Sequence, residues 1–182
     1  IYDNGTMTIT ANGYSDVYDG GTHAATATAS VAGAKVEWSQ DGEKWQDAAP
    51  SIKDVGEQTW QVRATAEGYT AKTATVTLKV TPATIEVTAN NASKAFDTAD
   101  PESFSYTVNS HAVSGETEAF DGALVREAGE AVGHYAIRQG TLALKDSGSF
   151  KASNYKLAFK EGDFEIYDNG TMTITANGYS DV

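Results

Sequence analysis

The chain is 182 residues long, carries a formal net charge of −12 at pH 7 and contains no cysteine. This acidic balance argues against a general nucleic-acid binder and against a protein of anionic membrane surfaces, because both partners require a basic face. No apolar run approaches the ~20 residues of a membrane-spanning helix. The lack of cysteine indicates either a reducing compartment or a lineage that exports proteins without disulfides. No signal peptide is present, so targeting and anchoring segments are expected to lie outside this fragment.

The opening stretch of the chain occurs twice. Residues 1–17 read IYDNGTMTITANGYSDV, and residues 166–182 repeat them letter for letter at an offset of 165 residues. Self-similarity at a fixed period is the signature of repeat architectures, so we interpret the chain as one period of a tandem array plus the start of the next. Near-identical tandem copies suit a protein that supplies length or many equal sites rather than one reaction centre.

Short segments with apolar residues at alternate positions predict strands in the first half of the chain. The expected strands cover residues 7–12, 24–31, 35–39, 59–66 and 73–80. Asp41-Gly42 between two such segments is a strong hairpin signal, and Lys44-Trp45 is expected to begin the returning strand. Pro50 then interrupts the pattern.

The pattern begins again after Thr81-Pro82-Ala83, which is expected to form a short, stiff joint because proline fixes φ. At an offset of 78 residues, Ile9–Asn12 matches Val87–Asn90 and Tyr18-Asp19 matches Phe96-Asp97. The second half of the chain is therefore interpreted as a diverged copy of the first.

Two further matches support this internal duplication. Val55-Gly56 resembles Val132-Gly133, and Tyr69–Val80 overlays Tyr155–Ile166 without a gap. The predicted organisation is a tail of a preceding module at 1–6, a first module at 7–81, a second module at 82–168 and the start of the next repeat at 169–182.

Short strands and turns at sandwich-like spacing predict an all-β chain. Its expected architecture is two tandem β-sandwich modules in line, followed by the opening strand of a third. Residues 114–125 and 128–132 are the least strand-like, and a helical turn is considered there. Residues 171–182 are expected to be a strand without its own module, held by the second module or by a neighbouring copy.

Strand parity predicts which large side chains fill the two cores. Trp38 and Trp60 are expected to lie in the first core, and Tyr135 and Ile137 in the second. Removing the ring of a buried tryptophan leaves a large cavity, so Trp60→Ala is expected to cost about 3–5 kcal/mol.

The chain resembles a known family at several segments. TITANGYSDVYDG and IEVTANNASKAFD resemble the start of MBG repeat domains of the YDG and YGX types. The middle and end of these repeats resemble VEWSQDGEKW, IKDVGEQTWQVRATAEGYT, GALVREAGEAVGHYAIRQGTL, SNYKLAF and GDFEI. The second module departs from the pattern, because Phe96-Asp97-Thr98 stands where the family often has Tyr-Gly or Tyr-Asp-Gly. The geometry of that turn is left open.

The resemblance has consequences for fold and location. It implies an immunoglobulin-like β-sandwich fold in both modules. It also implies that the chain belongs to a long, exported bacterial adhesin, with an extracellular location at the cell surface or cell wall. Exported proteins of this kind commonly do without disulfides, which fits the absence of cysteine.

The residues that most often carry chemistry do not assemble into a recognisable site. His23, His111 and His134 are far apart in sequence, and none has a second metal-type residue at ligand spacing. Asp97-Thr98-Ala99-Asp100 offers two carboxylates but lacks the remaining oxygen ligands of a calcium loop. No nucleophile-elbow, Walker or dinucleotide motif is present. We therefore expect no catalytic residue, no cofactor and no metal site, and we do not expect an enzyme.

Trp45 is the one candidate for ligand contact. It follows the Asp41-Gly42 turn and lies outside the clear strand pattern, so it is either an exposed platform for a sugar or a staple over the end of the sandwich. A side-chain cross-link of the kind found in wall-displayed sandwiches is also considered. The candidates are Lys35, Lys79, Asn90 and Gln61, and no signature selects a pair.

Two functions remain in competition. In the first, the chain is the repeat unit of a bacterial surface adhesin and acts as a stalk or spacer that projects a binding region from the cell. In the second, each copy weakly binds a glycan or mucin, and the array gains avidity. The expected partners are adjacent repeats of the same protein, with host glycan or mucin under the second function. We expect neither nucleic-acid binding nor membrane insertion within this fragment.

Overall fold

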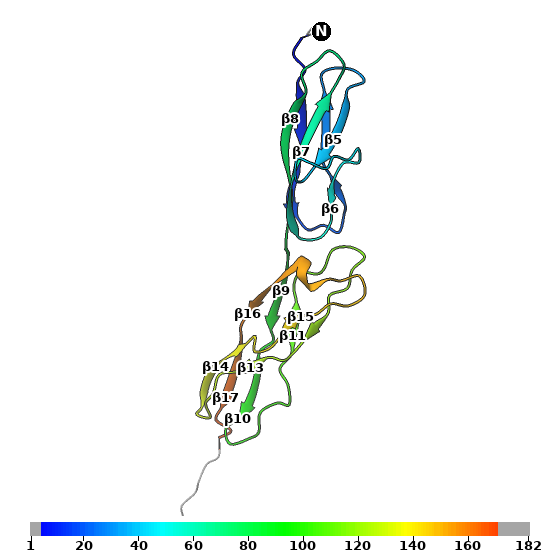
Figure 1. Ribbon diagram of the computed structural model, residues 1–182. Coiled ribbons are helices and arrows are strands. Elements are labelled where there is room, and N and C mark those ends of the chain that lie inside the picture. Colours follow the sequence, from blue (N-terminus) through cyan, green and yellow to red (C-terminus); the bar gives the residue numbers. More distant parts are fainter. Residues whose placement is uncertain (1–4, 171–182) are drawn as a thin grey trace, which may run out of the picture. The chain divides into compact units, whose positions relative to one another are not determined.

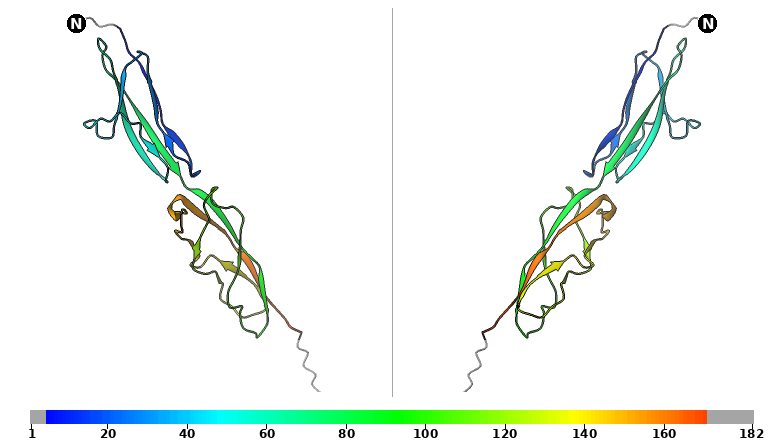
Figure 2. Two further views of the ribbon diagram at one scale, coloured as in Figure 1. Left: turned by 90° about the vertical axis from the view of Figure 1, so that its right-hand side faces the viewer. Right: turned by 90° about the vertical axis from the view of Figure 1, so that its left-hand side faces the viewer.

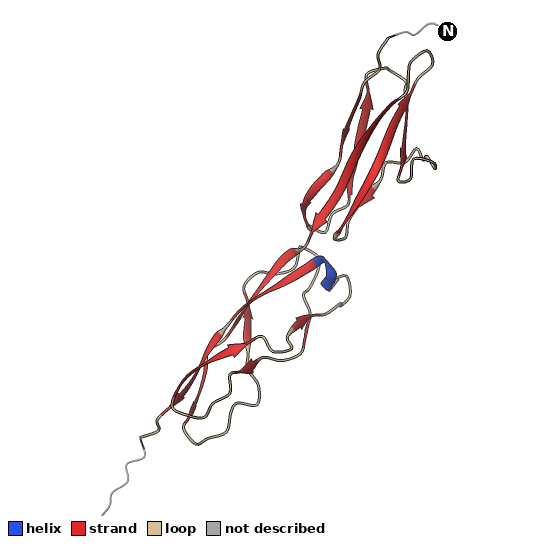
Figure 3. Cartoon of the chain, turned by 60° about the vertical axis from the view of Figure 1, so that its left-hand side comes forward, coloured by secondary structure: helices blue, strands red, loops and turns tan. Residues whose placement is uncertain are grey.

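The computed structural model describes residues 5–170, and in this range the chain is all-β. Figure 3 shows the strands together with η1 (Ala152–Asn154), a single turn of 3-10 helix. No helix within the described range is long and apolar enough to cross a membrane. The predicted strand at 171–182 lies outside the described residues.

The chain divides into two compact units. Unit 1 contains the chain up to Thr84 together with Ala112–Ala119 and Asp146–Lys156. Unit 2 contains Ile85–His111, Phe120–Lys145 and the chain from Leu157 onward. Two segments that lie within the second predicted module in sequence therefore belong to unit 1. The module boundaries inferred from the repeats stay a prediction.

Unit 1 is built on a four-stranded sheet and two short two-stranded sheets (Figure 1). The four-stranded sheet has the order β2 (Tyr14–Val17), β8 (Lys72–Thr81), β7 (Gly56–Thr65), β5 (Lys35–Ser39). The two-stranded sheets pair β1 (Ile9–Asn12) with β4 (Thr26–Ala29), and β3 (His23–Ala24) with β6 (Ser51–Ile52).

Period-two alternation fixes the inward face of the long strands β7 and β8. Their buried residues are Val62, Ala64, Val76, Leu78 and Val80. Trp38 on β5 is also in the core, with 3% of its surface exposed, as predicted. Trp60 has the same strand parity as Val62 but is only half-buried, and its Nε1 donates to Gln58 Oε1 at 3.1 Å. Parity alone therefore overstated the burial of Trp60, because it lies nearer the start of β7, where the neighbouring positions are exposed.

The hairpin predicted at Asp41-Gly42 forms only in part. Asp41 Oδ1 accepts hydrogen bonds from the backbone N–H groups of Glu43 and Lys44, which closes the turn. The returning chain makes a single bridge, between Trp38 and Gln46, and no strand begins at Lys44. The ladder partner of β5 is instead β7, which comes later in the sequence.

Unit 2 has a second four-stranded sheet, of order β10 (Ala92–Ala95), β17 (Gly162–Tyr167), β14 (Gly133–Arg138), β13 (Val125–Arg126). A three-stranded sheet places β9 (Ala83–Ala89) between β11 (Tyr106–Val108) and β16 (Tyr155–Lys160), as Figure 2 shows with β9 in green beside β16 in orange. The strands β12 (Phe120–Asp121) and β15 (Ala143–Leu144) form a further pair. The core residues are Ile85, Val87, Ala89, Leu124, Ile137, Leu142, Phe164 and Ile166.

The two four-stranded sheets have the same pairing pattern. In unit 1, β2 runs parallel to β8 and pairs Val17 with Thr81. In unit 2, β10 runs parallel to β17 and pairs Ala95 with Tyr167. The next strand of each sheet is antiparallel and begins at a glycine. In unit 1, Gly56 of β7 pairs with Val80, the penultimate residue of β8. In unit 2, Gly133 of β14 pairs with Ile166, the penultimate residue of β17.

The least strand-like segments contain no helical turn. Within residues 114–125 the chain forms β12 and enters β13, and residues 128–132 are loop. The 3-10 turn lies instead at Ala152–Asn154, directly before β16. Asn154 is buried there with 1% of its surface exposed, so its polar side chain requires partners inside unit 1.

Candidate functional site

Trp45 lies beside the strand β7 and is half-buried. Its Nε1 donates to the carbonyl oxygen of Gly42 at 3.1 Å, which ties the indole to the turn that precedes it. The guanidinium carbon of Arg63 lies 4.1 Å from the centroid of the indole ring, in a cation–π contact. One face of Trp45 is thus occupied by Arg63, and its possible role in ligand contact stays a prediction.

Arg63 is held in place by a buried carboxylate. Its Nε donates to Glu37 Oε2 at 2.9 Å, and Lys35 Nζ donates to Glu37 Oε1 at 2.5 Å. These two hydrogen bonds, that from Lys35 first, lower the pKa of Glu37 below its usual value. One connected cluster is therefore formed by Lys35, Glu37, Arg63 and Trp45.

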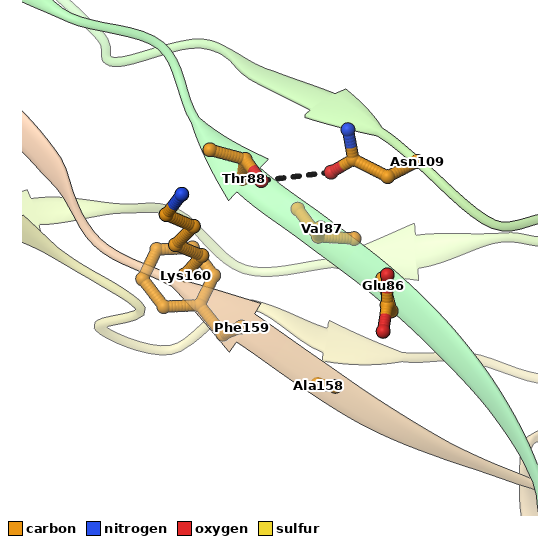
Figure 4. Close-up of a pocket in the computed structure, with 7 residues that line it drawn as sticks. All are labelled: Glu86, Val87, Thr88, Asn109, Ala158, Phe159 and Lys160. Atoms are coloured by element: carbon orange, nitrogen blue, oxygen red, sulfur yellow. Dashed lines mark hydrogen bonds between the residues drawn. The ribbon is translucent and has the colours of Figure 1, made fainter.

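A groove of about 370 Å³ lies on unit 2 (Figure 4). Its lining residues are Glu86, Val87, Thr88, Asn109, Ala158, Phe159 and Lys160. The side chains of Glu86 and Thr88 on β9 point away from the core. Successive side chains of a strand point to opposite faces, and Val87 between them is buried. Thr88 Oγ1 donates to Asn109 Oδ1 at 2.8 Å, which orients the Asn109 amide.

The groove combines an aromatic ring, an amide, a hydroxyl and one charge of each sign. This set can contact a small polar ligand such as a sugar. Sequence reasoning missed the groove because β9 and β16 are distant in the chain. The outward parity of Glu86, Thr88 and Lys160 was visible, but their proximity required knowledge of the strand pairing.

An ion-pair network of two buried cations and two more exposed carboxylates includes the turn that was considered for calcium. Asp100 accepts from Arg126 Nε at 2.7 Å and from Lys94 Nζ at 2.8 Å. Glu130 accepts from Arg126 Nη2 at 2.5 Å and also pairs with Lys94. The side chains of Lys94 and Arg126 are only 5% and 8% exposed. The Asp100 carboxylate is therefore committed to two cations. Asp97, the other acid of this turn, has φ of 61°.

The charges in this network reinforce one another. Hydrogen bonds from Arg126 and Lys94 lower the pKa of Asp100 to about 2. Those to Asp100 and Glu130 raise the pKa of Lys94. The two lysines considered for a side-chain cross-link form ion pairs instead. Lys35 donates a hydrogen bond to Glu37, and Lys79 Nζ lies 2.8 Å from Glu57 Oε2.

The histidines lie in separate places. His23 stacks on Tyr14 with ring centroids 3.8 Å apart, and its Nε2 lies 2.9 Å from Asp19 Oδ1. His134 Nδ1 lies 2.8 Å from Asp163 Oδ2, and this contact raises the pKa of His134. Residues 5–170 contain no group of three His, Cys, Asp or Glu side chains that could hold a metal ion.

An aromatic cluster with a shared acceptor lies in unit 1. Tyr18 donates its hydroxyl to Glu116 Oε1 at 2.5 Å, and Tyr155 donates to Glu116 Oε2 at 2.9 Å. The two rings meet edge to face at 5.4 Å, and Phe150 stacks on Tyr155 at 4.8 Å. Burial, followed by the hydrogen bond to Glu116, raises the pKa of Tyr18 to about 12. Tyr18 and Tyr155 are 4% and 6% exposed, so this cluster is interior packing.

Polar contacts beside this cluster satisfy the buried Asn154. Its Oδ1 accepts from the Val55 N–H at 2.9 Å, and its Nδ2 donates to Asp54 Oδ1 at 3.0 Å. Lys151 Nζ donates to Asp54 Oδ2 at 2.5 Å. Residues near 54 and near 154 are thereby joined in unit 1, although 100 positions separate Asp54 from Asn154. No local sequence pattern signals such a pairing.

The search of curated proteins gave no match. Among solved structures, the chain is similar to fibronectin(III)-like modules of Clostridium thermocellum CbhA, at 14% identity over 94% of this chain and 100% of that chain. The TM-score is 0.30, and a likeness at that level supports no conclusion about this chain. The family model of the MBG domain (YGX type) matches residues 85–165, which confirms the resemblance for that part of the chain. MBG domains are non-catalytic and typical of bacterial surface proteins. Residues 85–165 are thus identified as an MBG domain of the YGX type.

Proposed function

We propose that this chain is the repeat unit of a bacterial surface adhesin and acts as a stalk or spacer that projects a binding region from the cell. The observation that carries the proposal is the letter-for-letter identity of residues 1–17 and 166–182. A period of 165 residues that restarts without change builds length by repetition. The MBG domain at 85–165 supports an extracellular location at the cell surface or cell wall.

The finer architecture is part of the proposal. We take each module as an immunoglobulin-like β-sandwich and the two modules as lying in line. The shared order and register of the two four-stranded sheets support a common fold. Only Pro82 separates β8 from β9, and a single residue with fixed φ leaves little freedom for bending.

The contacts within unit 1 fit the role of a stiff spacer. The segments 112–119 and 146–156 contribute Glu116, Asn154 and Tyr155 to the packing around Tyr18 and Val55. The residue after β2 and the residue before β7 are therefore bonded to residues 98 and 99 positions further along the chain. An ordering of this kind favours a semi-rigid rod over modules that move on free linkers.

Small-angle X-ray scattering on chains of one, two and three periods tests the stalk. The expected result is a maximum dimension that grows by the same increment with each added period. A matched variant with Pro82 replaced by a flexible glycine–serine linker should be shorter and more variable. Compact particles whose dimension grows only slowly with the number of periods would refute the stalk.

A second candidate function is weak glycan or mucin binding that gains avidity by repetition. The groove lined by Phe159, Asn109 and Lys160 favours it, because an aromatic ring beside an amide suits sugar recognition. A glycan-array screen on the full chain tests it, with Asn109→Ala as the groove variant. Lys156→Ala, on the same strand as Lys160 but outside the groove, is the control. Binding that survives Asn109→Ala unchanged, or no binding at all, would count against this function.

A further inference from the structure

An exposed apolar patch lies at one end of the four-stranded sheet of unit 2. Phe96, Val132 and Tyr167 are 45%, 54% and 44% exposed. Ala95 pairs with Tyr167 and Gly133 pairs with Ile166, which brings the three side chains to the end where β17 finishes. The Phe96 N–H donates to the Tyr167 carbonyl oxygen at 2.8 Å and fixes this end of the sheet.

The corresponding end of the sheet in unit 1 is covered. By the internal repeat, Tyr18 and Val55 correspond to Phe96 and Val132. The backbone bond recurs too, because the Tyr18 N–H donates to the Thr81 carbonyl oxygen at 2.8 Å. Yet Tyr18 is only 4% exposed, since the segments 112–119 and 146–156 pack over it.

These covering segments have counterparts earlier in the chain. Tyr155 overlays Tyr69 in the internal repeat. The turn 113–116 has the same geometry as the turn 31–34, with backbone bonds of 3.1 Å from Glu116 N to Val113 O and 3.2 Å from Ala34 N to Val31 O. The third residue of each turn is a glycine with positive φ, 89° in the later turn and 76° in the earlier one.

The counterparts lie together at the end of unit 1 where the chain enters. Lys35 pairs with Thr65, which places the turn 31–34 beside the loop that carries Tyr69. The Ser30 N–H donates to the Thr8 carbonyl oxygen at 2.9 Å, so the entering chain is at the same end. A following repeat, which begins again at residue 166, would bring this end directly after the patch on unit 2.

We propose that Phe96, Val132 and Tyr167 form the docking surface for the next copy of the repeat, which covers them with its turn 31–34 and its Tyr69. This inference rests on the proposed tandem array and adds to it a specific interface between copies. The partner is a second copy of this chain, joined in series.

The residues on both sides of the proposed interface differ from their counterparts in unit 1 in a matched way. In unit 1, the Tyr18 hydroxyl has a carboxylate acceptor in Glu116. In the proposed interface, Phe96 has no hydroxyl. The residue at the position of Glu116 is Ala34, whose side chain has no hydrogen-bond acceptor. Phe96 and Ala34 therefore do not bury an unpaired side-chain donor or acceptor against each other, which would otherwise oppose docking.

The neighbouring polar contact is replaced in the same way. In unit 1, Asp54 is bonded to Asn154. By the same alignment, Ala131 stands in place of Asp54 and Gly68 in place of Asn154. The proposed interface is therefore apolar where the contact in unit 1 is polar, and each surface suits its own neighbour in the array.

A disulfide between two introduced cysteines tests the interface. The natural chain has no cysteine, so no other thiol can react. A Cβ atom on Gly20 would lie 3.9 Å from Val113 Cβ, within the usual range for a disulfide. The corresponding pair in a chain of two periods is Thr98→Cys in the first copy and Val31→Cys in the second. The control carries the same two substitutions in the opposite copies, where the proposed interface does not join them.

Docking predicts that the thiols of the first arrangement become linked at least about tenfold faster than those of the control, because contact raises their effective concentration above that of a tether alone. A short bifunctional thiol reagent is used beside air oxidation, since the turns at Gly20 and Thr98 differ in backbone geometry. Adding Phe96→Asp in the first copy should abolish the difference. Equal linkage in both arrangements with both reagents would overturn the interface. Scattering that still showed an extended array in that case would leave the stalk standing.

Discussion

At the scale of single residues, the turn after β10 shows how the second module departs from the first. Asp97 has φ of 61°, in the left-handed region, whereas in the first module Gly20 takes that conformation one position later with φ of 80°. This conformation is unfavourable for residues other than glycine, because the Cβ atom crowds the following carbonyl oxygen. The departure from the family pattern at Phe96-Asp97-Thr98 thus coincides with a turn whose left-handed residue lies one position earlier than in the first module.

Asp97→Gly is therefore expected to stabilise unit 2 by about 1 kcal/mol, the approximate cost of a left-handed non-glycine residue. Asp97→Asn is the control, because it removes the charge but keeps the Cβ atom, and it should change stability little. Urea unfolding of the full chain measures both. An Asp97→Gly variant no more stable than the natural chain would contradict the strain argument.

The two tryptophans near the core are expected to differ in cost. Trp38→Ala should destabilise unit 1 by about 3–5 kcal/mol, because Trp38 is 3% exposed and its removal leaves a cavity. Trp60→Ala should cost less, about 1–2 kcal/mol, because the half-buried ring keeps part of its contact with water. Thermal unfolding of the two variants compares them directly. Equal losses of stability would mean that strand parity, and not the burial of the side chain in the structure, decides the effect.

At the scale of elements, the network of Lys94, Asp100, Arg126 and Glu130 fastens β10 and β13 to the loops beside them. Arg126 also lies 5.0 Å from the ring centroid of Phe164, on the central strand β17. Cations this buried depend on their carboxylates, since an unpaired buried charge is strongly unfavourable. Asp100 is the carboxylate with two cationic partners and a pKa lowered to about 2.

The stability of unit 2 is expected to depend on acid through Asp100. Its folded-state pKa of about 2 lies below the ordinary value of 3.8, so its contribution is complete above about pH 4 and is lost as the pH falls toward 2. Asp100→Asn should cost about 2 kcal/mol at neutral pH by removing a charged acceptor. The difference between the natural chain and this variant should shrink between pH 4 and 2. A difference that does not change with pH would exclude the carboxylate as its source.

Elements defined by local alternation could be predicted from the sequence. The strands β5, β7 and β8 follow the period-two pattern, and Trp38 and Ile137 are buried as expected. Tyr135, by contrast, is only half-buried. The groove at Glu86 and Lys160 could not be predicted, because it depends on which distant strands pair. The same holds for the network around Arg126, whose partner Asp100 lies 26 positions earlier.

At the scale of the whole chain, unit 1 is held together by contacts that span most of the sequence. Glu116 accepts from Tyr18, which lies 98 positions earlier, and from Tyr155, 39 positions later. Closing such long loops has an entropic cost, but this cost grows only slowly with loop length. Two charge-assisted hydrogen bonds and the buried rings around them can therefore offset it.

Removing this acceptor should destabilise unit 1, even though Glu116 belongs to the second half of the sequence. Glu116→Ala leaves two buried tyrosine hydroxyls without their acceptor and is expected to lower the free energy of unfolding by about 2–6 kcal/mol, at about 1–3 kcal/mol for each unsatisfied group. Glu116→Gln keeps one acceptor oxygen and should cost about half as much. Hydrogen exchange of the β2 and β8 amides should quicken in the same order.

Alkaline unfolding provides an independent measurement of the same contact. The pKa of Tyr18 is raised from 10.0 to about 12, so the neutral hydroxyl is favoured in the folded state. Its contribution to stability is complete below about pH 10 and is lost as the pH rises through 12. In Tyr18→Phe, which keeps the ring but has no hydroxyl to ionise, the fall in stability over this interval should be smaller than in the natural chain. An identical alkaline profile for the two proteins would mean that Tyr18 is not held by Glu116 in solution, and the segments 112–119 and 146–156 would then not be bound to the first module through this cluster.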